Sequence, residues 1–339
     1  MLQSYVAGMH FPQALSNHQT FARQAGYSWW ERIKFNHKVN LGFRAANARL
    51  KETLERGACF YGPFKGEFGH FTAHTLPFLM YLHQQGVRIH YCGMDLHRPL
   101  LVDEKGESIV ETAVWLRDFF GEVPPVSNST VPPADVIQQM QQFYSRAQAT
   151  DLPLWDIADD FFYWFVHRQW LLKGHTHTYD LSKFYKSRYE KSCVIFPRSK
   201  GARESHNHGL AWDYTKVIDR LLPWYDHIYV CGHPAQVLHL EARPKVELRI
   251  TADNASILEA CSNANLILTQ HSGVNNLGEF TNTPVLLLYR GGEGPEDIGS
   301  LNNTLWFRQG LQEQYPLSYA FDLDQLEAFV IQHTKVPRG

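Results

Sequence analysis

Residues 266–290 read LILTQHSGVNNLGEFTNTPVLLLYR, in which two apolar runs flank a segment of small and polar residues. The runs at 266–270 and 284–290 have the length of a strand and almost no charge, as strands buried on both faces do. Between them, residues 273–281 predict a short helix directly after the first strand. Strand, helix and strand in this order form the repeating unit of a parallel sheet covered by helices, so the stretch predicts an α/β fold.

The second half of the chain repeats this alternation. Strands are predicted at 192–198, 227–232 and 246–250. Helices are predicted at 212–223, 235–242 and 254–264, and a closing helix at 323–334 has Asp322 as its N-cap. The pattern predicts a doubly wound domain, in which ligands bind in the loops at the carboxyl ends of the strands.

The first half contains a second unit of the same kind. Residues 1–57 are expected to be mainly helical, and they precede strands at 58–64 and 87–93 with a helix at 70–85 between them. Further helices are predicted at 108–120, 134–149 and 155–172. We expect two Rossmann-like domains that face a cleft, with the closing helix packing back on the first. The first domain is predicted at 1–185 and the second at 186–339. Within the first domain, the helical lead-in covers 1–57 and the sheet begins at residue 58.

Composition excludes several classes of protein. Of the 339 residues, 44% are hydrophobic and 19% are charged, which is typical of a globular chain and not of a disordered one. The 32 Lys and Arg residues and the 34 Asp and Glu residues give a net charge of −2. No general electrostatic attraction to nucleic acid or to anionic lipid is therefore expected.

The apolar segments and the cysteines favour a cytoplasmic protein. The longest apolar run, residues 161–166, is far shorter than the roughly 20 residues that span a bilayer. The N-terminus shows no basic segment followed by a long apolar one, so no secretory signal is expected. The 5 cysteines are widely spaced and form no CxxC pair, which fits a reducing compartment. We expect a cytoplasmic location, with at most peripheral contact at the inner face of a membrane.

The polar segment of the opening stretch is a candidate anion site. Backbone N–H groups of Ser272, Gly273 and Val274 would point out of a helix N-terminus, which suits a diphosphate. Glu279 lies about two helical turns further on, where a carboxylate could accept both hydroxyls of a ribose. On spacing alone, a simple capping turn with a solvated Glu279 is the alternative interpretation.

A basic segment leaves the strand predicted at 192–198. Arg198, Lys200 and Arg203 place three cations within six residues, interrupted by Gly201. Cations at the end of a strand can neutralise a pyrophosphate. The alternative is a solvated basic loop.

A glycine-rich segment, GPFKGEFGH at 62–70, leaves the first predicted strand. Its glycines allow a close approach of the backbone to a ligand. Glu67 and His70 are its titratable groups at the expected edge of the cleft. The alternative is a glycine-rich turn in which Glu67 is a charge at a helix N-terminus.

Taken together, residues 190–300 resemble the donor domain of glycosyltransferases with the GT-B fold. The matching positions are His271, Gly273, Asn275 or Asn276, Glu279 and Pro284. The resemblance implies a nucleotide-sugar donor, with the nucleoside and sugar near His271, Asn275, Asn276 and Glu279. It also implies that Arg198 and Lys200 bind the donor phosphates and stabilise the departing nucleotide.

The segment GEFGH at 66–70 looks similar to the acidic, glycine-rich loop of the heptosyltransferase-like branch. The resemblance implies that Glu67 is the base that takes a proton from the acceptor hydroxyl, with His70 in reserve. We therefore expect an inverting glycosyltransferase that needs no metal and no cofactor. Its expected partners are a nucleotide-sugar donor and a glycan, lipid-linked or protein hydroxyl acceptor.

Two other functions stay open. Arg290, Glu293, Pro295 and Glu296 look similar to the end of the donor site in non-hydrolysing nucleotide-sugar 2-epimerases, which share the fold. A binding module that holds a nucleotide without turnover is the other alternative. The Asp322-Leu-Asp324 triplet has the spacing of a metal-binding Asp-x-Asp, but it opens a predicted helix, where capping is the expected role.

Overall fold

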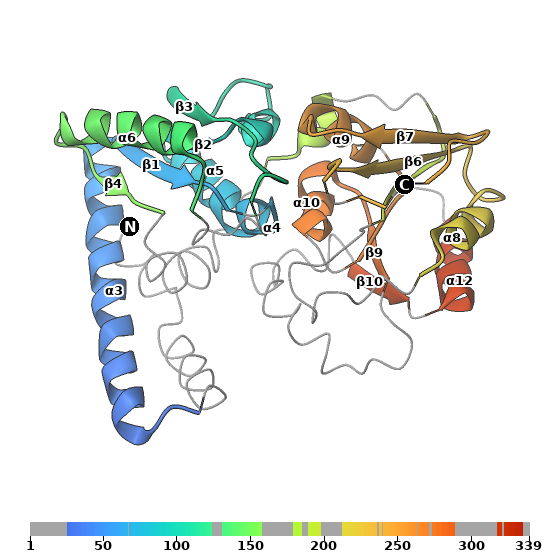
Figure 1. Ribbon diagram of the computed structural model, residues 1–339, viewed down its shortest axis with the longest axis horizontal. Helices are drawn as coiled ribbons and strands as arrows, with labels where there is room; N and C mark the ends of the chain where they lie inside the picture. The colour runs from blue at the N-terminus through green and yellow to red at the C-terminus, as the bar shows by residue number, and fades with distance from the viewer. Residues whose placement is uncertain are drawn as a thin grey trace.

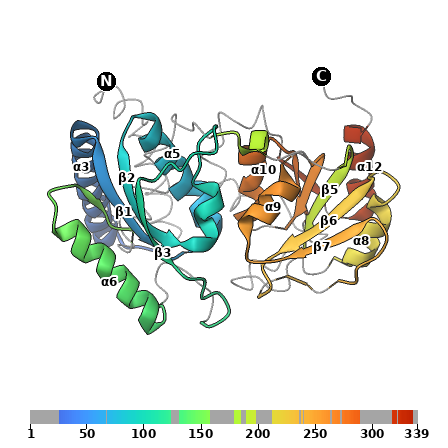
Figure 2. The same cartoon turned by 90° about the horizontal axis from the view of Figure 1, so that it is seen from above.

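The computed structural model describes the chain at residues 26–66, 68–123, 131–157, 179–184, 189–197, 212–235, 237–238, 240–262, 264–270, 273–288, 317–320 and 322–334. Two open sheets lie side by side, and all of their strand pairs are parallel (Figures 1 and 2). Helices pack on both sheets, so the predicted α/β class with two Rossmann-like sheets is confirmed.

The N-terminal sheet has the strand order β3-β2-β1-β4. Its strands are β1 (Ala58–Phe64), β2 (Arg88–Met94), β3 (Thr112–Leu116) and β4 (Leu154–Trp155). β3 lies inside the helix that we predicted at 108–120, and that prediction was wrong. Thr112, Val114 and Trp115 have β-branched or aromatic side chains, which favour strands, and pairing with β2 supplies the backbone hydrogen bonds. The helix predicted at 155–172 starts instead as β4, and its residues from 158 on lie outside the described ones.

Helices cover both faces of this sheet. Phe60 and Tyr61 are neighbours in β1, so their side chains point to opposite faces of the sheet. Phe60 contacts Phe143 of α6 (Ala134–Gln148), with ring centroids 5.6 Å apart. Tyr61 contacts Phe78 of α5 (Leu76–Gln84) on the other face. Helix α5 continues α4 (Phe68–His70) and the π-helical turn η1 (Phe71–Thr75), so the helix predicted at 70–85 is present in three joined pieces.

A long helix, α3 (Trp29–Arg56), precedes β1 and confirms a helical lead-in over the described part of 1–57. Ser28 and Glu31 form a capping box at its start. It ends at Gly57, whose φ of 64° closes the helix in the left-handed conformation that glycine adopts without strain.

The C-terminal sheet has the order β10-β9-β8-β5-β6-β7. If β5 to β10 are renumbered 1 to 6 and the sheet is listed from the β7 edge, this order is 3-2-1-4-5-6. This is the strand order of dinucleotide-binding Rossmann domains. The strands are β5 (Ser192–Phe196), β6 (His227–Gly232), β7 (Val246–Ile250), β8 (Leu266–Thr269), β9 (Val285–Leu288) and β10 (Leu317–Ala320). The helices are α8 (Tyr214–Leu221), α9 (Asn254–Cys261), α10 (Leu277–Thr281) and α12 (Leu323–Thr334), with a 3-10 turn η6 (Gly273–Asn276) before α10.

The helix predicted at 235–242 is wrong for its described residues, which form a turn and irregular backbone. Pro234 and Pro244 bracket the segment, and Leu238 donates its backbone N–H to the Pro197 oxygen at 2.8 Å, not to a helical partner. At the other end of the domain, α12 begins as predicted, because Asp322 accepts a hydrogen bond from the Gln325 N–H at 2.8 Å. Within the described part of the chain, this helix packs on α8 and β10 of its own domain, and not on the first domain as we expected (Figure 1).

One of the three clusters of buried side chains that the described residues form spans both sheets. A single cluster of buried side chains includes Phe64 and Phe71 of the N-terminal sheet and its helices, and also Val194, Leu277 and Phe280 of the C-terminal one. Among the described residues, no helix has both the length and the apolar character needed to cross a membrane.

Candidate functional site

The order of the C-terminal sheet reverses between β5 and β8, which is where ligands bind in folds of this kind. These strands are neighbours, and their last residues, Phe196 and Thr269, are paired in register. The basic segment after β5 and the polar segment after β8 therefore depart from adjacent points on one edge of the sheet. Five predicted site residues of these segments lie outside the described residues: Arg198, Lys200, Arg203, His271 and Ser272.

Beyond β8, three of the predicted site residues are buried. Gly273 opens η6, and the side chains of Asn275, Asn276 and Glu279 are packed inside the protein. Glu279 is only 7% exposed, so it is not the solvated helix residue of the alternative interpretation. A carboxylate buried to this degree requires hydrogen-bonding or charged partners, which is a property of binding sites as well as of structural ones.

The glycine-rich segment after β1 lies directly against this part of the C-terminal sheet. A Cβ atom on Gly273 would lie 2.2 Å from the Gly69 Cα, and one on Gly69 would lie 2.8 Å from the Gly273 Cα. A Cβ atom does not approach a non-bonded backbone carbon this closely, so a side chain at either position would force the two backbones apart. Two glycines that the sequence places in separate motifs therefore meet backbone to backbone.

Hydrogen bonds hold this contact. The Thr72 hydroxyl donates to the Gly273 oxygen at 3.2 Å, and the Asn276 side-chain amide donates to the Thr72 hydroxyl at 3.2 Å. The same amide lies 3.4 Å from the Gly69 oxygen. Asn276, predicted to contact the nucleoside or the sugar, thus contacts the helical segment that follows β1. Glu67 lies outside the described residues; His70 ends α4, and its side chain is not among the described ones.

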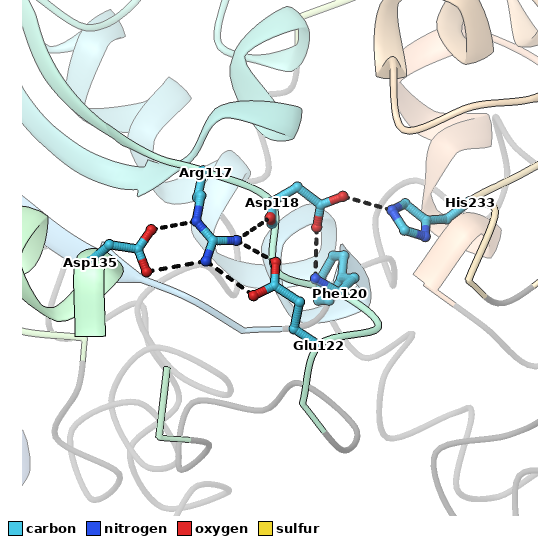
Figure 3. A network of polar contacts seen from close by, with 6 residues as sticks. All are labelled: Arg117, Asp118, Phe120, Glu122, Asp135 and His233. Atoms are coloured by element: carbon cyan, nitrogen blue, oxygen red, sulfur yellow. Dashed lines mark hydrogen bonds and ion pairs between the residues drawn. The ribbon is translucent and has the colours of Figure 1, made fainter. Parts of the chain in front are cut away.

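A second contact joins the residues that follow β3 and β6. The His233 Nε2 and the Asp118 Oδ2 are 2.8 Å apart, and Figure 3 shows His233 reaching Asp118 from the other sheet. Burial raises the pKa of the Asp118 carboxyl, but hydrogen bonds from His233 and from the Phe120 N–H outweigh it, so the net pKa is lowered. Asp118 is therefore ionised at neutral pH. Arg117, next to it, binds Glu122 and Asp135.

A third contact follows β2 and β7. Asn254, at the start of α9, donates its side-chain amide to the Leu96 oxygen in the 3-10 turn η2 (Asp95–Leu100). Each of these contacts joins segments that come directly after the carboxyl ends of strands. The carboxyl edges of the two sheets, where folds of this kind bind ligands, therefore face one another.

His97, in η2, is a buried titratable group that the sequence motifs did not reveal. Its ring stacks on Phe71, with centroids 4.1 Å apart, and both ring nitrogens are buried without a hydrogen-bond partner among the described residues. Burial lowers the pKa of His97 to about 3, so the ring is neutral. Lys65, directly after β1, is also buried. The sequence did not predict the burial of either side chain, because lysine is mostly exposed in proteins and a lone histidine has no characteristic spacing.

Within the described residues, no group of three or more His, Cys, Asp or Glu side chains is arranged to hold a metal ion. The 5 cysteines are all buried and none forms a disulfide, as expected for small core residues.

No protein-family model and no curated protein matches the chain in sequence. In structure it is similar to a glycosyl transferase of family 9 from Veillonella parvula, with 12% identity, 83% of this chain and 90% of the other covered, and a TM-score of 0.45. It is also similar to the E. coli heptosyltransferase WaaC, with 11% identity, coverage of 81% and 97%, and a TM-score of 0.46. A third similar structure is the E. coli ADP-heptose heptosyltransferase II, with 13% identity, coverage of 81% and 98%, and a TM-score of 0.45.

Proposed function

We propose that this protein is a glycosyltransferase that moves a sugar from a nucleotide-sugar donor to a hydroxyl acceptor. The observation that carries the proposal is the meeting of the two ligand-binding edges at Gly69 and Gly273. It brings the segment with a candidate base against the segment with candidate phosphate-binding groups. Enzymes that transfer a group between two substrates need this juxtaposition.

The C-terminal sheet would bind the donor. Arg198, Lys200 and Arg203 follow β5, where three cations can neutralise a diphosphate, and the Ser272 and Gly273 N–H groups follow β8. Glu279, with His271 and Asn275, would contact the nucleoside and the sugar. Asn276, whose side-chain amide also donates to the Thr72 hydroxyl, would belong to the same group.

The N-terminal sheet would supply the base. As the acceptor oxygen forms its bond to the anomeric carbon, Glu67 takes the hydroxyl proton and the bond from that carbon to the phosphate oxygen breaks. Attack from the face opposite the leaving group inverts the configuration. The cations after β5 stabilise the negative charge that develops on the departing nucleotide, so the reaction needs no metal.

The acceptor would be a hydroxyl of a glycan, of a lipid-linked sugar or of a protein, and the reaction would take place in the cytoplasm. The buried, unpaired thiols of all 5 cysteines suit a reducing compartment.

A thermal-shift screen with UDP, GDP, ADP, CMP and dTDP tests donor binding. A nucleotide at a hundred times its Kd should add about 2.7 kcal/mol to the free energy of unfolding. The shift should disappear in Arg198→Ala with Lys200→Ala, and persist in the control Lys216→Ala, whose side chain is exposed and pairs with Asp213 on α8. The absence of a shift with all five nucleotides would contradict the proposal.

Product analysis separates transfer from the two alternatives. Solvent deuterium at C2 of the sugar in a recovered nucleotide sugar, without acceptor, would identify an epimerase. Nucleotide binding with neither transfer nor exchange over a panel of acceptors would identify a binding module.

A further inference from the structure

Helix α3 has two halves with opposite surroundings. In its C-terminal half, Ala46, Leu50 and Thr53 are fully buried against the N-terminal sheet, and the Thr53 hydroxyl accepts a hydrogen bond from the Trp155 ring N–H at 2.9 Å. Its N-terminal half extends beyond the sheet along the outer edge of the molecule (Figure 1). That half carries large apolar side chains in solvent: Trp29 is 59% exposed, Trp30 66%, Ile33 42% and Leu41 50%.

The exposed half is a well-formed helix. The Ser28 and Glu31 capping box satisfies backbone N–H groups at its start, and the rings of Trp29 and Trp30 contact each other edge to face with centroids 4.3 Å apart. Tryptophan is rarely exposed to this extent, and a cluster of exposed apolar side chains marks an interaction surface.

The spacing places these side chains on one outer face. Trp30, Ile33, His37, Leu41 and Arg44 follow one another at helical intervals of three or four residues, so they form one stripe along the helix. We call this stripe, with Trp29, the outer face of α3.

The net charge of the segment that carries the outer face indicates what kind of surface it binds. Residues 29–44 contain four cations, Arg32, Lys34, Lys38 and Arg44, and one acid, Glu31, so the segment has a net charge of 4 − 1 = +3, whereas the whole chain has −2. A second copy of the chain would oppose this charge to itself. An anionic surface would complement it.

We propose that the outer face of α3 binds the surface of an anionic lipid bilayer. Tryptophan is the side chain most enriched at the boundary between lipid and water, and lysine and arginine reach from that boundary to anionic headgroups. The helix lies in the plane of the membrane, with its apolar stripe in the headgroup region. The proposal goes beyond the donor site and does not depend on it, because α3 lies on the opposite side of the N-terminal sheet from the C-terminal one (Figure 1).

Co-sedimentation of the full chain with lipid vesicles tests this proposal. Vesicles of equal parts phosphatidylglycerol and phosphatidylcholine should bind the protein at least tenfold more tightly than phosphatidylcholine alone, and added salt should weaken that binding. Trp29→Ser with Trp30→Ser, and separately Lys34→Glu with Lys38→Glu, should each reduce binding by about tenfold or more.

The controls are Val131→Ser, an exposed apolar residue outside α3, and Lys216→Glu on α8; both should bind as the wild type does. The thermal midpoint of each variant without vesicles should stay near that of the wild type, because the replaced side chains are exposed. Equal binding to both vesicle types, or unchanged binding of the tryptophan and lysine variants, would overturn the proposal. So would a dimer in light scattering that the tryptophan variant abolishes, because the face would then be a self-association surface.

Discussion

The two sheets begin with the same strand order, 3-2-1-4, but carry different chemistry after their first strand. In the N-terminal sheet, β1 leads into glycines, one carboxylate and one imidazole at 66–70. In the C-terminal sheet, β5 leads into three cations at 198–203. The topology creates the same kind of edge twice, and we propose that the side chains give proton transfer to one edge and anion binding to the other.

The largest expected effect concerns the proposed base after β1, in the N-terminal sheet. Glu67→Gln keeps the size of the side chain and removes its basic oxygen, so kcat should fall by about 10²–10⁴-fold while nucleotide binding stays nearly unchanged. Steady-state kinetics and a nucleotide titration measure the two quantities. The control is Glu55→Gln, an exposed carboxylate on α3.

His70→Ala distinguishes the two candidate bases, since the residue that acts as the base should show the large loss of kcat alone. Full turnover with weakened nucleotide binding in Glu67→Gln would make Glu67 a donor-binding residue, and the two edges would then share one role.

The next largest effect concerns the proposed phosphate-binding cations after β5, in the C-terminal sheet. Arg198→Ala removes a charge-assisted contact to phosphate, so nucleotide binding should weaken by about 1.5–3 kcal/mol, which calorimetry resolves. Lys216→Ala is the matched control on α8. Nucleotide affinity equal to that of the wild type would remove Arg198 from the donor site.

The third prediction concerns the contact that joins the halves. Gly273→Ala adds a Cβ atom at 2.2 Å from the Gly69 Cα, so the backbones must separate, at a cost of about 1–3 kcal/mol in the free energy of unfolding. Gly69→Ala, with its closest approach at 2.8 Å, should have a smaller effect in chemical denaturation. Unchanged stability in both variants would mean that the two edges do not touch.

The smallest expected effect concerns Asp118 and His233, a partly exposed contact worth at most about 1 kcal/mol. The lowered pKa of Asp118 means that the contact adds stability above the usual value of 3.8, and that this stability is lost as the pH falls through the folded pKa. Wild type should therefore exceed Asp118→Asn in thermal midpoint at neutral pH and converge with it in stronger acid. A constant difference across that range would show that the carboxylate charge is not involved.

The sequence was a good guide to short strands that are rich in apolar residues. β1, β6 and β7 have the predicted bounds: β1 and β6 are nearly continuous apolar runs, whereas β7 alternates apolar and charged residues. β3 was missed because its pairing with β2 outweighs the local pattern, and β10 because its four residues form no long apolar run.

In the candidate site, too, the local sequence predicted some features, and others depend on tertiary contacts. Glycines, cations and carboxylates could be recognised as local motifs in the sequence. The contacts between the motifs could not, because Thr72 and Gly273 are 201 residues apart and Asp118 and His233 are 115 apart. Burial of His97 and Lys65 likewise arises only when several elements pack around them.

The central claim is that a nucleotide binds where the C-terminal sheet reverses its strand order, between β5 and β8. Hydrogen exchange with and without a saturating nucleoside diphosphate tests this most directly. Amide exchange should slow in the peptides that follow these two strands, at 197–211 and 270–280, and stay unchanged in α6 and α12. Protection confined to other parts of the chain would contradict the claim.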